Sequence, residues 1–302
     1  MDGILPLFKP KGMTSHDCVT KLRKILKIKK IGHTGTLDPD ADGVLPICIG
    51  KATKVAQYIT DAGKTYEGEV TIGVSTTTED ASGEIVAVKP VETPITREEI
   101  LNVFEQLTGE IIQTPPMYSA VKVKGKKLYE YAREGIEVDR PQRTVTIYSL
   151  ELLDERRIFQ GEKISFRFRA ACSKGTYIRT LAVTIGEMLG YPAHLSALTR
   201  VKTAAFTVSD CLTFEQIKEK AENGEIAEVL KPLETALFSL PKYKINDKLI
   251  EKVKNGAVFP TPPDWKFADS HVAMVDKDGK VHAIYHIHPK RRELIKPIKV
   301  LS

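Results

Sequence analysis

A short turn-rich segment, residues 32–43 (GHTGTLDPDADG), carries Asp38, Asp40 and Asp42 at alternate positions. Its three glycines and one proline disfavour a regular helix or central strand and favour tight turns. The apolar run that follows at 44–50 (VLPICIG) predicts a buried strand or core segment. A carboxylate-rich loop anchored to a hydrophobic core at its exit can direct side chains into a cleft.

Three interpretations of this loop are possible. The alternating aspartates followed by Gly43 look like the start of an EF-hand calcium loop, but Ile49 stands where that loop needs a bidentate glutamate. In a second interpretation a single carboxylate, Asp38, acts with His33 and Thr34 close by in sequence. In the third, the aspartates only cap backbone N–H groups of a surface turn. The loop alone disfavours calcium and leaves the other two open.

An arginine in a predicted helix is a further candidate for chemistry. Thr176 begins a helix that runs to about Leu189 and is ended by Gly190. Arg179 therefore lies in the first turn, where the helix dipole disfavours a cation. Such an arginine needs an acidic partner or an anionic ligand, unless it is simply exposed to solvent.

Basic residues gather near the N-terminus. A turn presents Lys9 and Lys11, and a helix capped by Thr14 or Ser15 then runs to about Ile28. The polar face of this helix is either a solvated surface or a place to hold a phosphate backbone. The basic residues of that face and of the segment after it are Lys21, Arg23, Lys24, Lys27, Lys29 and Lys30.

A second basic segment, residues 117–133 (MYSAVKVKGKKLYEYAR), alternates lysines with aromatic residues. Surfaces that bind single-stranded nucleic acid combine positive charge with aromatic stacking in this way. We therefore prefer a nucleic-acid-binding surface to an ordinary charged surface as the interpretation of this segment.

The elements that must position these residues can be read from periodicity. Alternation and β-branched content predict strands at 64–74, 145–153 and 163–172. A capping box at 96–99 opens a helix to about Leu107, and a further helix is predicted at 214–222. From about Tyr243 to Ser302, short strands, turns and basic residues indicate a small β-rich appendage. At 302 residues, one large domain and a small one are expected.

Composition limits the class of protein. A hydrophobic content of 42% and a charged content of 28% are ordinary for a soluble globular chain, and the formal net charge of +6 is compatible with a polyanionic partner. No apolar run reaches the roughly 20 residues that span a bilayer, and the N-terminus has no secretory pattern, so we expect a cytoplasmic protein. Four scattered cysteines predict no metal site, and we interpret His282, His286 and His288 as a surface cluster.

Residues 32–46 resemble the signature loop of the TruB family, bacterial synthases that make pseudouridine at position 55 of tRNA. The similarity runs from about Leu5 to Phe206 and continues more weakly to the C-terminus. Five ordered blocks are far more specific than one motif. The other four are KPKGMTS at 9–15, KTY at 64–66, PPMYSA at 115–120 and GTYIR at 175–179.

The resemblance implies an α+β fold, the pseudouridine-synthase fold, with a mixed, mainly antiparallel central sheet flanked by helices. It assigns residues 1–240 to a catalytic domain, in which residues of about 115–140 form an insertion that grips RNA. It assigns residues 243–302 to a small β-rich, PUA-like domain that binds RNA. The sequence of this last part alone would not have identified it.

The resemblance also implies a reaction. Uridine becomes pseudouridine when its N1–C1′ bond breaks and the base is rejoined through C5, a change that needs neither cofactor nor metal. Asp38 matches the catalytic carboxylate of the family, and an ionised aspartate can act as a nucleophile. Arg179 would pair with Asp38 and keep the carboxylate ionised and oriented. This pairing would supply the acidic partner that its helix position needs.

Four further matches concern the bound RNA. Tyr66 would stack on the target base and relay a proton, and Tyr177 and Leu198 match positions that line the uridine pocket. Because the target base is inaccessible in a folded T loop, it must be flipped out. His33 matches the histidine that fills the space left by flipped bases.

The implied partner is tRNA through its T-stem loop, bound by a monomer without a membrane or an obligate protein partner. One alternative is a synthase for another RNA, because archaeal and eukaryotic relatives modify rRNA with the help of a guide RNA. Another is a non-catalytic RNA-binding protein that folds tRNA with the same cleft. The joint presence of Asp38, Tyr66 and Arg179 speaks against a degenerate site, and the compact C-terminal region favours the stand-alone type.

Overall fold

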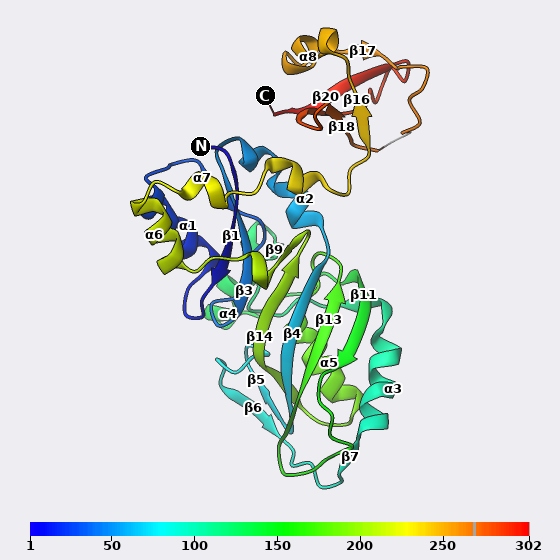
Figure 1. The fold of residues 1–302 in the computed structure, drawn as a ribbon. Helices are drawn as coiled ribbons and strands as arrows, with labels where there is room; N and C mark the ends of the chain where they lie inside the picture. Colours follow the sequence, from blue (N-terminus) through cyan, green and yellow to red (C-terminus); the bar gives the residue numbers. More distant parts are fainter. Residues whose placement is uncertain (268–269, 302) are drawn as a thin grey trace.

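A computed structural model describes residues 1–267 and 270–301 of the chain. Within them, a mixed sheet of nine strands forms the larger part of the molecule (Figure 1). Its strands are β1 (Gly3–Lys9), β2 (Ile31–His33), β3 (Asp42–Ile49), β4 (Lys64–Ile72), β8 (Gly109–Gln113), β11 (Arg143–Leu152), β13 (Ile164–Cys172), β14 (Ala193–Thr203) and β15 (Phe206–Thr207).

The strand order of this sheet is β1-β3-β14-β4-β13-β11-β8, with β2 beside β3 and β15 beside β14. Strands β3 and β14 pair in parallel, and every other neighbouring pair is antiparallel. The predicted mixed, mainly antiparallel sheet is therefore confirmed. The strands predicted at 64–74, 145–153 and 163–172 correspond to β4, β11 and β13.

Strand β3 is buried on both faces, because its side chains alternate between two hydrophobic clusters. Leu45 and Ile47 pack on one side with helices α1 (Ser15–Leu26) and α6 (Phe214–Glu222). Val44 and Cys48 pack on the other side with the short helices η1 (Gly50–Val55), α2 (Ala56–Asp61) and η3 (Leu233–Leu237). The aspartate-rich loop runs directly into this strand, so its C-terminal end is anchored in a fully buried part of the sheet.

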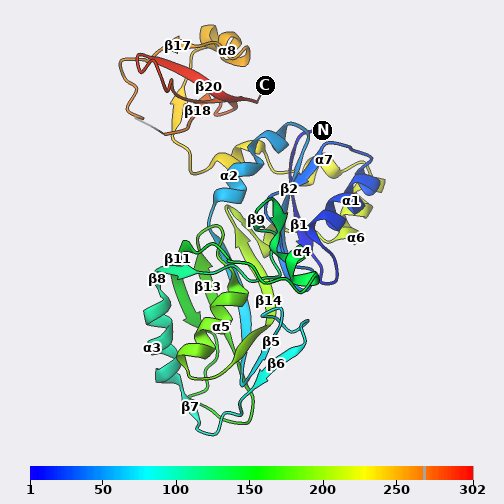
Figure 2. The ribbon, with the colours of Figure 1, turned by 180° about the vertical axis from the view of Figure 1, so that it is seen from behind.

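The other half of the sheet is covered by helices α3 (Arg97–Leu107) and α5 (Ile178–Met188) (Figure 2). Phe104 of α3 meets Phe166 and Phe168 of β13 in the core, with ring centroids 6.3 and 6.4 Å apart. The capping box predicted for α3 is present, since the Thr96 hydroxyl and the Glu99 carboxylate each accept a hydrogen bond from the other residue's backbone N–H. Helices α3 and α5 begin one and two residues after their predicted starts, Thr96 and Thr176.

The C-terminal part forms a second sheet in the order β16-β18-β19-β20-β17. This sheet confirms the predicted β-rich appendage. Helix α8 (Asp247–Lys254), which was not predicted, covers it. The two parts share a core, because Leu237, Ile59 and Ile284 belong to one buried cluster. The strands are β16 (Lys242–Lys244), β17 (Phe259–Pro260), β18 (Val272–Val275), β19 (Val281–Ile287) and β20 (Leu294–Val300).

The basic-aromatic segment folds as a small unit of its own. Strands β9 (Lys122–Val123) and β10 (Lys126–Lys127) form a hairpin with a two-residue loop. The loop residues, Lys124 and Gly125, both have positive φ. The remaining elements are α4 (Leu128–Arg133), β5 (Val74–Thr76), β6 (Ile85–Val88), β7 (Ile95–Thr96), β12 (Ile158–Phe159), η2 (Val208–Asp210) and α7 (Ile226–Val229).

Two observations complete the fold. Lys9, predicted in an exposed turn, is 0% exposed instead and lies at the end of the buried strand β1. Across the described ranges, no helix has both the length and the apolar character that crossing a bilayer requires.

Candidate active site

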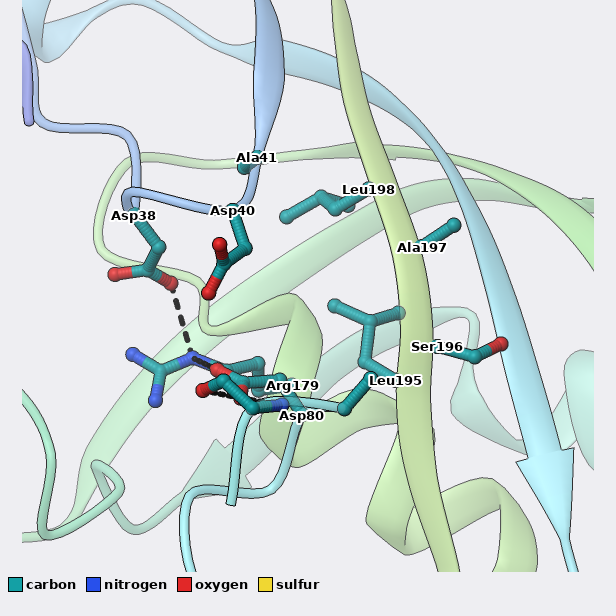
Figure 3. A pocket seen from close by; sticks show the side chains of 11 residues that line it. Asp38, Asp40, Ala41, Asp80, Arg179, Leu195, Ser196, Ala197 and Leu198 are labelled. Carbon is teal, nitrogen blue, oxygen red and sulfur yellow. Dashed lines mark hydrogen bonds and ion pairs between the residues drawn. The ribbon is translucent and has the colours of Figure 1, made fainter. Parts of the chain in front are cut away.

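A pocket of about 300 Å³ lies where the loop after β2, the turn between β5 and β6, helix α5 and strand β14 meet (Figure 3). Acidic side chains stand on one side of it and apolar side chains of β14 on the other. The lining residues are Asp38, Asp40, Ala41, Asp80, Ala81, Ser82, Arg179, Leu195, Ser196, Ala197 and Leu198.

Arg179 connects the acidic side of the pocket. Its Nε lies 3.0 Å from Asp38 Oδ2 and 3.7 Å from Asp80 Oδ2. Its two terminal nitrogens donate to the backbone carbonyls of Thr78 and Tyr118, each at 2.9 Å. The guanidinium is therefore fixed from four directions, and the predicted pairing with Asp38 is present. The acidic partner that an arginine in the first turn of α5 needs is found.

The Asp38 carboxylate is held between opposing influences. Burial raises the pKa of Asp38, and the negative charge of Asp80 acts in the same direction, whereas Arg179 lowers it. The side chain is still 41% exposed, while that of Arg179 is only 6% exposed. A carboxylate whose pKa is raised is a stronger base and nucleophile when ionised, and its open side faces the pocket.

Buried polar side chains from outside the loop hold Asp38 in place. The ammonium group of Lys9 donates to the carbonyls of Pro39 at 3.1 Å and Ala41 at 2.6 Å, on either side of Asp40. The Ser15 hydroxyl accepts from the backbone N–H of Leu37 at 2.9 Å. The backbone around Asp38 is thereby bonded at positions 37, 39 and 41.

Arg200 of β14 fixes both ends of the same loop. It is 1% exposed, and its Nε donates to the carbonyl of Val44 at 2.8 Å. Its terminal nitrogens reach the carbonyls of Gly35 and Thr36 at 3.3 and 3.4 Å. Gly43 is required beside it, because its φ is +109° and a Cβ there would lie 2.2 Å from the Arg200 carbonyl oxygen.

Tyr66 lies beneath the loop and does not line the pocket. Its side chain is 8% exposed and belongs to the same core cluster as Leu37 and Ala41. Burial raises the pKa of its hydroxyl, and the neighbouring Arg200 opposes this change. The phenol is therefore kept neutral next to a buried cation.

Tyr177 and His33 also lie outside the lining. Tyr177 is the N-cap of α5, where its N–H donates to Gln113 Oε1 at 3.0 Å and its carbonyl accepts from Gln113 Nε2 at 3.2 Å. His33 ends β2, and burial lowers its pKa, which favours the neutral imidazole. Among the described residues its buried Nδ1 has no hydrogen-bond partner. Of the six predicted site residues, the pocket thus brings together Asp38, Arg179 and Leu198.

The loop aspartates do not converge as calcium ligands would. Asp38 faces Arg179, and Asp42, the first residue of β3, accepts from the hydroxyl of Thr199 at 2.6 Å. Within residues 1–267 and 270–301, no three or more histidine, cysteine or acidic side chains are grouped to hold a metal ion.

Four residues that shape the site were not predicted to be site residues. Asp80 is one, and its second oxygen, Oδ1, accepts from the hydroxyls of Thr78 and Ser82, each at 2.6 Å. In the sequence Asp80 lies in a polar segment, residues 75–83, that has no distinguishing pattern. The others are Lys9, Gln113 and Arg200, whose burial could be found only from their long-range contacts.

Family models and known relatives match most of the chain. Residues 23–178 match the family described as TruB family pseudouridylate synthase (N terminal domain), and residues 179–238 match the tRNA pseudouridylate synthase B C-terminal domain. A tRNA pseudouridine synthase B of Geobacillus thermodenitrificans is 61% identical over 99% of both chains. One of Bacillus cereus is 56% identical over 100% of this chain and 97% of its own.

Solved structures point the same way. The chain is similar to one in a crystal structure of a Cbf5-Nop10-Gar1 complex, with 28% identity, a TM-score of 0.76 and coverage of 99% of this chain and 85% of that one. It is also similar to one in an archaeal box H/ACA sRNP Nop10-Cbf5 complex, with 26% identity, a TM-score of 0.74 and coverage of 99% and 86%. The chain belongs to the TruB family of pseudouridylate synthases.

Proposed function

We propose that this protein isomerises uridine to pseudouridine in tRNA, at position 55 of the T loop. The observation that carries the proposal is the ion pair of Asp38 and Arg179 at a pocket of about 300 Å³, the lower end of the range for small-ligand sites. The full-length similarity to proteins named tRNA pseudouridine synthase B supports tRNA as the substrate.

Asp38 is the reacting group of the proposed mechanism. The N1–C1′ bond breaks, C5 forms the new bond to C1′, C5 loses its proton and N1 gains one. Three routes use the same carboxylate: attack on C6 of the base, attack on C1′ of the sugar, or a glycal intermediate. In each route Arg179 orients Asp38 and favours its ionised form, and the base stays in the pocket while it is detached.

The apolar side of the pocket suits the flat faces of a uracil ring. Leu198 and Leu195 of β14 stand opposite the carboxylates, so a base between them would present its edge to Asp38. Tyr66 is proposed to stack on that base and to relay a proton, and Tyr177 to close the pocket at the start of α5. Both need a small rearrangement on RNA binding, since neither ring lines the pocket of the free protein.

Base flipping gives the remaining predicted residues their roles. A neutral His33 with an unpaired, buried Nδ1 among the described residues is suited to fill the space that flipped bases leave. The insertion at about 115–140 would then close on the T-stem loop. Its exposed Lys122 and Lys124 offer charge for the RNA backbone.

The chain organisation follows from this proposal. Residues 1–240 would form the catalytic domain and residues 243–302 a PUA-like RNA-binding domain, acting as a cytoplasmic monomer without a protein partner. The structurally similar Cbf5 chains occur in complexes with other proteins, but the relatives with 56–61% identity are named tRNA pseudouridine synthase B.

The test is conversion of a defined uridine by the purified protein alone. An unmodified T-stem-loop RNA is incubated without guide RNA, and pseudouridine is mapped by carbodiimide labelling and primer extension. A matched RNA with cytidine at position 55 is the control. We expect one labelled position in the first RNA and none in the second. If the RNA is bound but never converted, the chain is an RNA-folding protein or acts on another RNA, and the proposal is wrong.

A further inference from the structure

A second recess, of about 480 Å³, lies at the C-terminal end of helix α1, apart from the pocket that holds Asp38. Arg23, Lys27 and Lys29 line it together with Ile28. Three cations around one recess create a positive potential that attracts anions. We call these four residues the α1 recess.

The cations of the α1 recess have no acidic partners among residues 1–267 and 270–301. Arg23 donates a hydrogen bond from one terminal nitrogen to the carbonyl of Ile31 at 3.2 Å, and Lys27 and Lys29 are exposed without an ion pair. Elsewhere on the surface, lysines do pair with carboxylates, as in Lys174 with Asp61 at 2.8 Å. The recess thus keeps three like charges together, an arrangement that an anionic ligand would stabilise.

Helix stability does not account for this grouping. A cation in the last turn of a helix is favoured by the dipole, which explains Arg23. Lys27 and Lys29 lie beyond the last helical residue, Leu26. Lys27 moreover has a φ of +55° at the C-cap, a left-handed conformation that usually belongs to glycine or asparagine. A lysine at such a position points to a use for its charge.

Helix α1 connects the α1 recess, at its C-terminal end, with the loop that carries Asp38, at its N-terminal end. The Ser15 hydroxyl at the start of α1 accepts from the backbone N–H of Leu37 at 2.9 Å, and the helix runs 12 residues from there, which at 1.5 Å per residue is about 18 Å. An RNA whose base enters the pocket therefore has further backbone within reach of the recess.

We propose that the α1 recess binds backbone phosphates of the tRNA, outside the target nucleotide, and so forms a second anchoring site. This inference rests on the proposed function. The charges contact phosphates and read no bases, so the site adds affinity and register without sequence preference. Release of counterions from each neutralised phosphate makes the contribution visible as salt dependence.

The experiment measures binding of an unmodified tRNA transcript between about 50 and 200 mM salt. The test variant is K27N/K29Q, in which asparagine suits the left-handed position. A matched control, R157Q/K163Q, removes two exposed charges near β12 and the start of β13, at the end of the sheet opposite α1. A second pair, K27R/K29R, keeps the charge. Conversion of the same transcript is followed in parallel.

The slope of log K against log salt should become shallower by about 1.5 in K27N/K29Q, from roughly 0.7–0.9 for each lost phosphate contact. It should be unchanged in K27R/K29R and nearly so in R157Q/K163Q, and the turnover rate at saturation should stay at the wild-type value. A wild-type slope in K27N/K29Q, or an equal loss in the control, overturns the second site. A wild type that binds but does not convert the RNA overturns the proposed function instead.

Discussion

The loop that carries Asp38 and the insertion at about 115–140 both lack long regular elements, and both depend on cations, but they use them differently. The loop is held by Lys9 of β1 and Arg200 of β14, which are buried and donate to its backbone carbonyls across 30 to 165 positions of the chain. In the insertion, Lys126 and Arg133 lie 4.8 and 5.3 Å from the rings of Tyr131 and Tyr129, close neighbours in sequence.

This difference indicates which region is rigid and which can adjust. A buried cation that satisfies several carbonyls is expensive to displace, because its partners would remain buried without a hydrogen bond. A surface cation over an aromatic ring contributes about 0.5–1 kcal/mol and can be exchanged for a contact with RNA. The Asp38 carboxylate is therefore held in place before RNA binds, whereas the surface contacts of the insertion are the ones that RNA can replace.

The largest effect is expected at the rigid centre, from Arg179→Lys. An ammonium group cannot reach Asp38 and the carbonyls of Thr78 and Tyr118 with the planar geometry of a guanidinium. We expect the turnover rate to fall by about 10²–10³-fold, the range for losing one electrostatic contact at a reacting group. Single-turnover kinetics measure it, with Arg167→Lys on the exposed face of β13 as control. A silent Arg179→Lys contradicts the pairing.

Lys9→Met tests the support of the loop. Removing the ammonium group leaves the carbonyls of Pro10, Pro39 and Ala41 without their donor. The free energy of unfolding should fall by about 3 kcal/mol, and turnover should fall with it. Denaturant titration measures the first quantity. The matched variant Lys11→Met, two residues away and exposed, should change it by under about 0.5 kcal/mol. Equal losses of stability in Lys9→Met and Lys11→Met would contradict the support of the loop by Lys9.

A further buried cation, Lys64, gives a pH test. Burial, with Arg200 nearby, lowers the pKa of Lys64 to about 8. Between about 8 and the usual 10.5 the unfolded chain binds the extra proton, so this group makes the free energy of unfolding rise with pH there, by up to about 3 kcal/mol. Lys64→Met should lose that rise, whereas Lys174→Met, exposed and paired with Asp61, should keep it. Parallel curves for wild type and Lys64→Met between pH 8 and 10 would contradict a buried charge.

The smallest effect is expected in the adjustable region. Lys122→Gln removes one exposed charge from β9, so the salt slope of binding to a T-stem loop should drop by about 0.7–0.9. The free energy of unfolding should change by under about 0.5 kcal/mol. Lys163→Gln, at the start of β13, is the control for net charge. A large loss of stability in Lys122→Gln would show that the insertion is as rigid as the loop.

Local patterns explain how much of the fold the sequence could predict. The capping box at Thr96 and the alternation of β4, β11 and β13 are properties of neighbouring residues, and these elements were predicted within about two residues. The burial of Lys9 and the capping role of Gln113 on α5 depend on contacts across the sheet and left no local signal. His282, predicted in a surface cluster, is buried and lies 2.9 Å from Asp276 for the same reason.

The residues of the candidate site also differ in how well the sequence could predict them. Asp38 and Arg179 could be named from family blocks, and the helix position of Arg179 gave an independent physical reason for an acidic partner. Leu198 also lines the pocket. Asp80 was missed because a polar turn residue has many ordinary uses, and its approach to Arg179 becomes visible only once the β5–β6 hairpin is folded against α5.

The most direct test of the account compares wild type with Asp38→Asn on the same T-stem-loop RNA, without added metal, measuring binding and pseudouridine formation together. Asparagine keeps the shape of the side chain but cannot serve as the ionised nucleophile. We expect near-wild-type binding and a loss of turnover of about 10⁴-fold or more, as when the nucleophile of a covalent catalyst is removed. Turnover near the wild-type rate in Asp38→Asn would contradict the central role of this carboxylate.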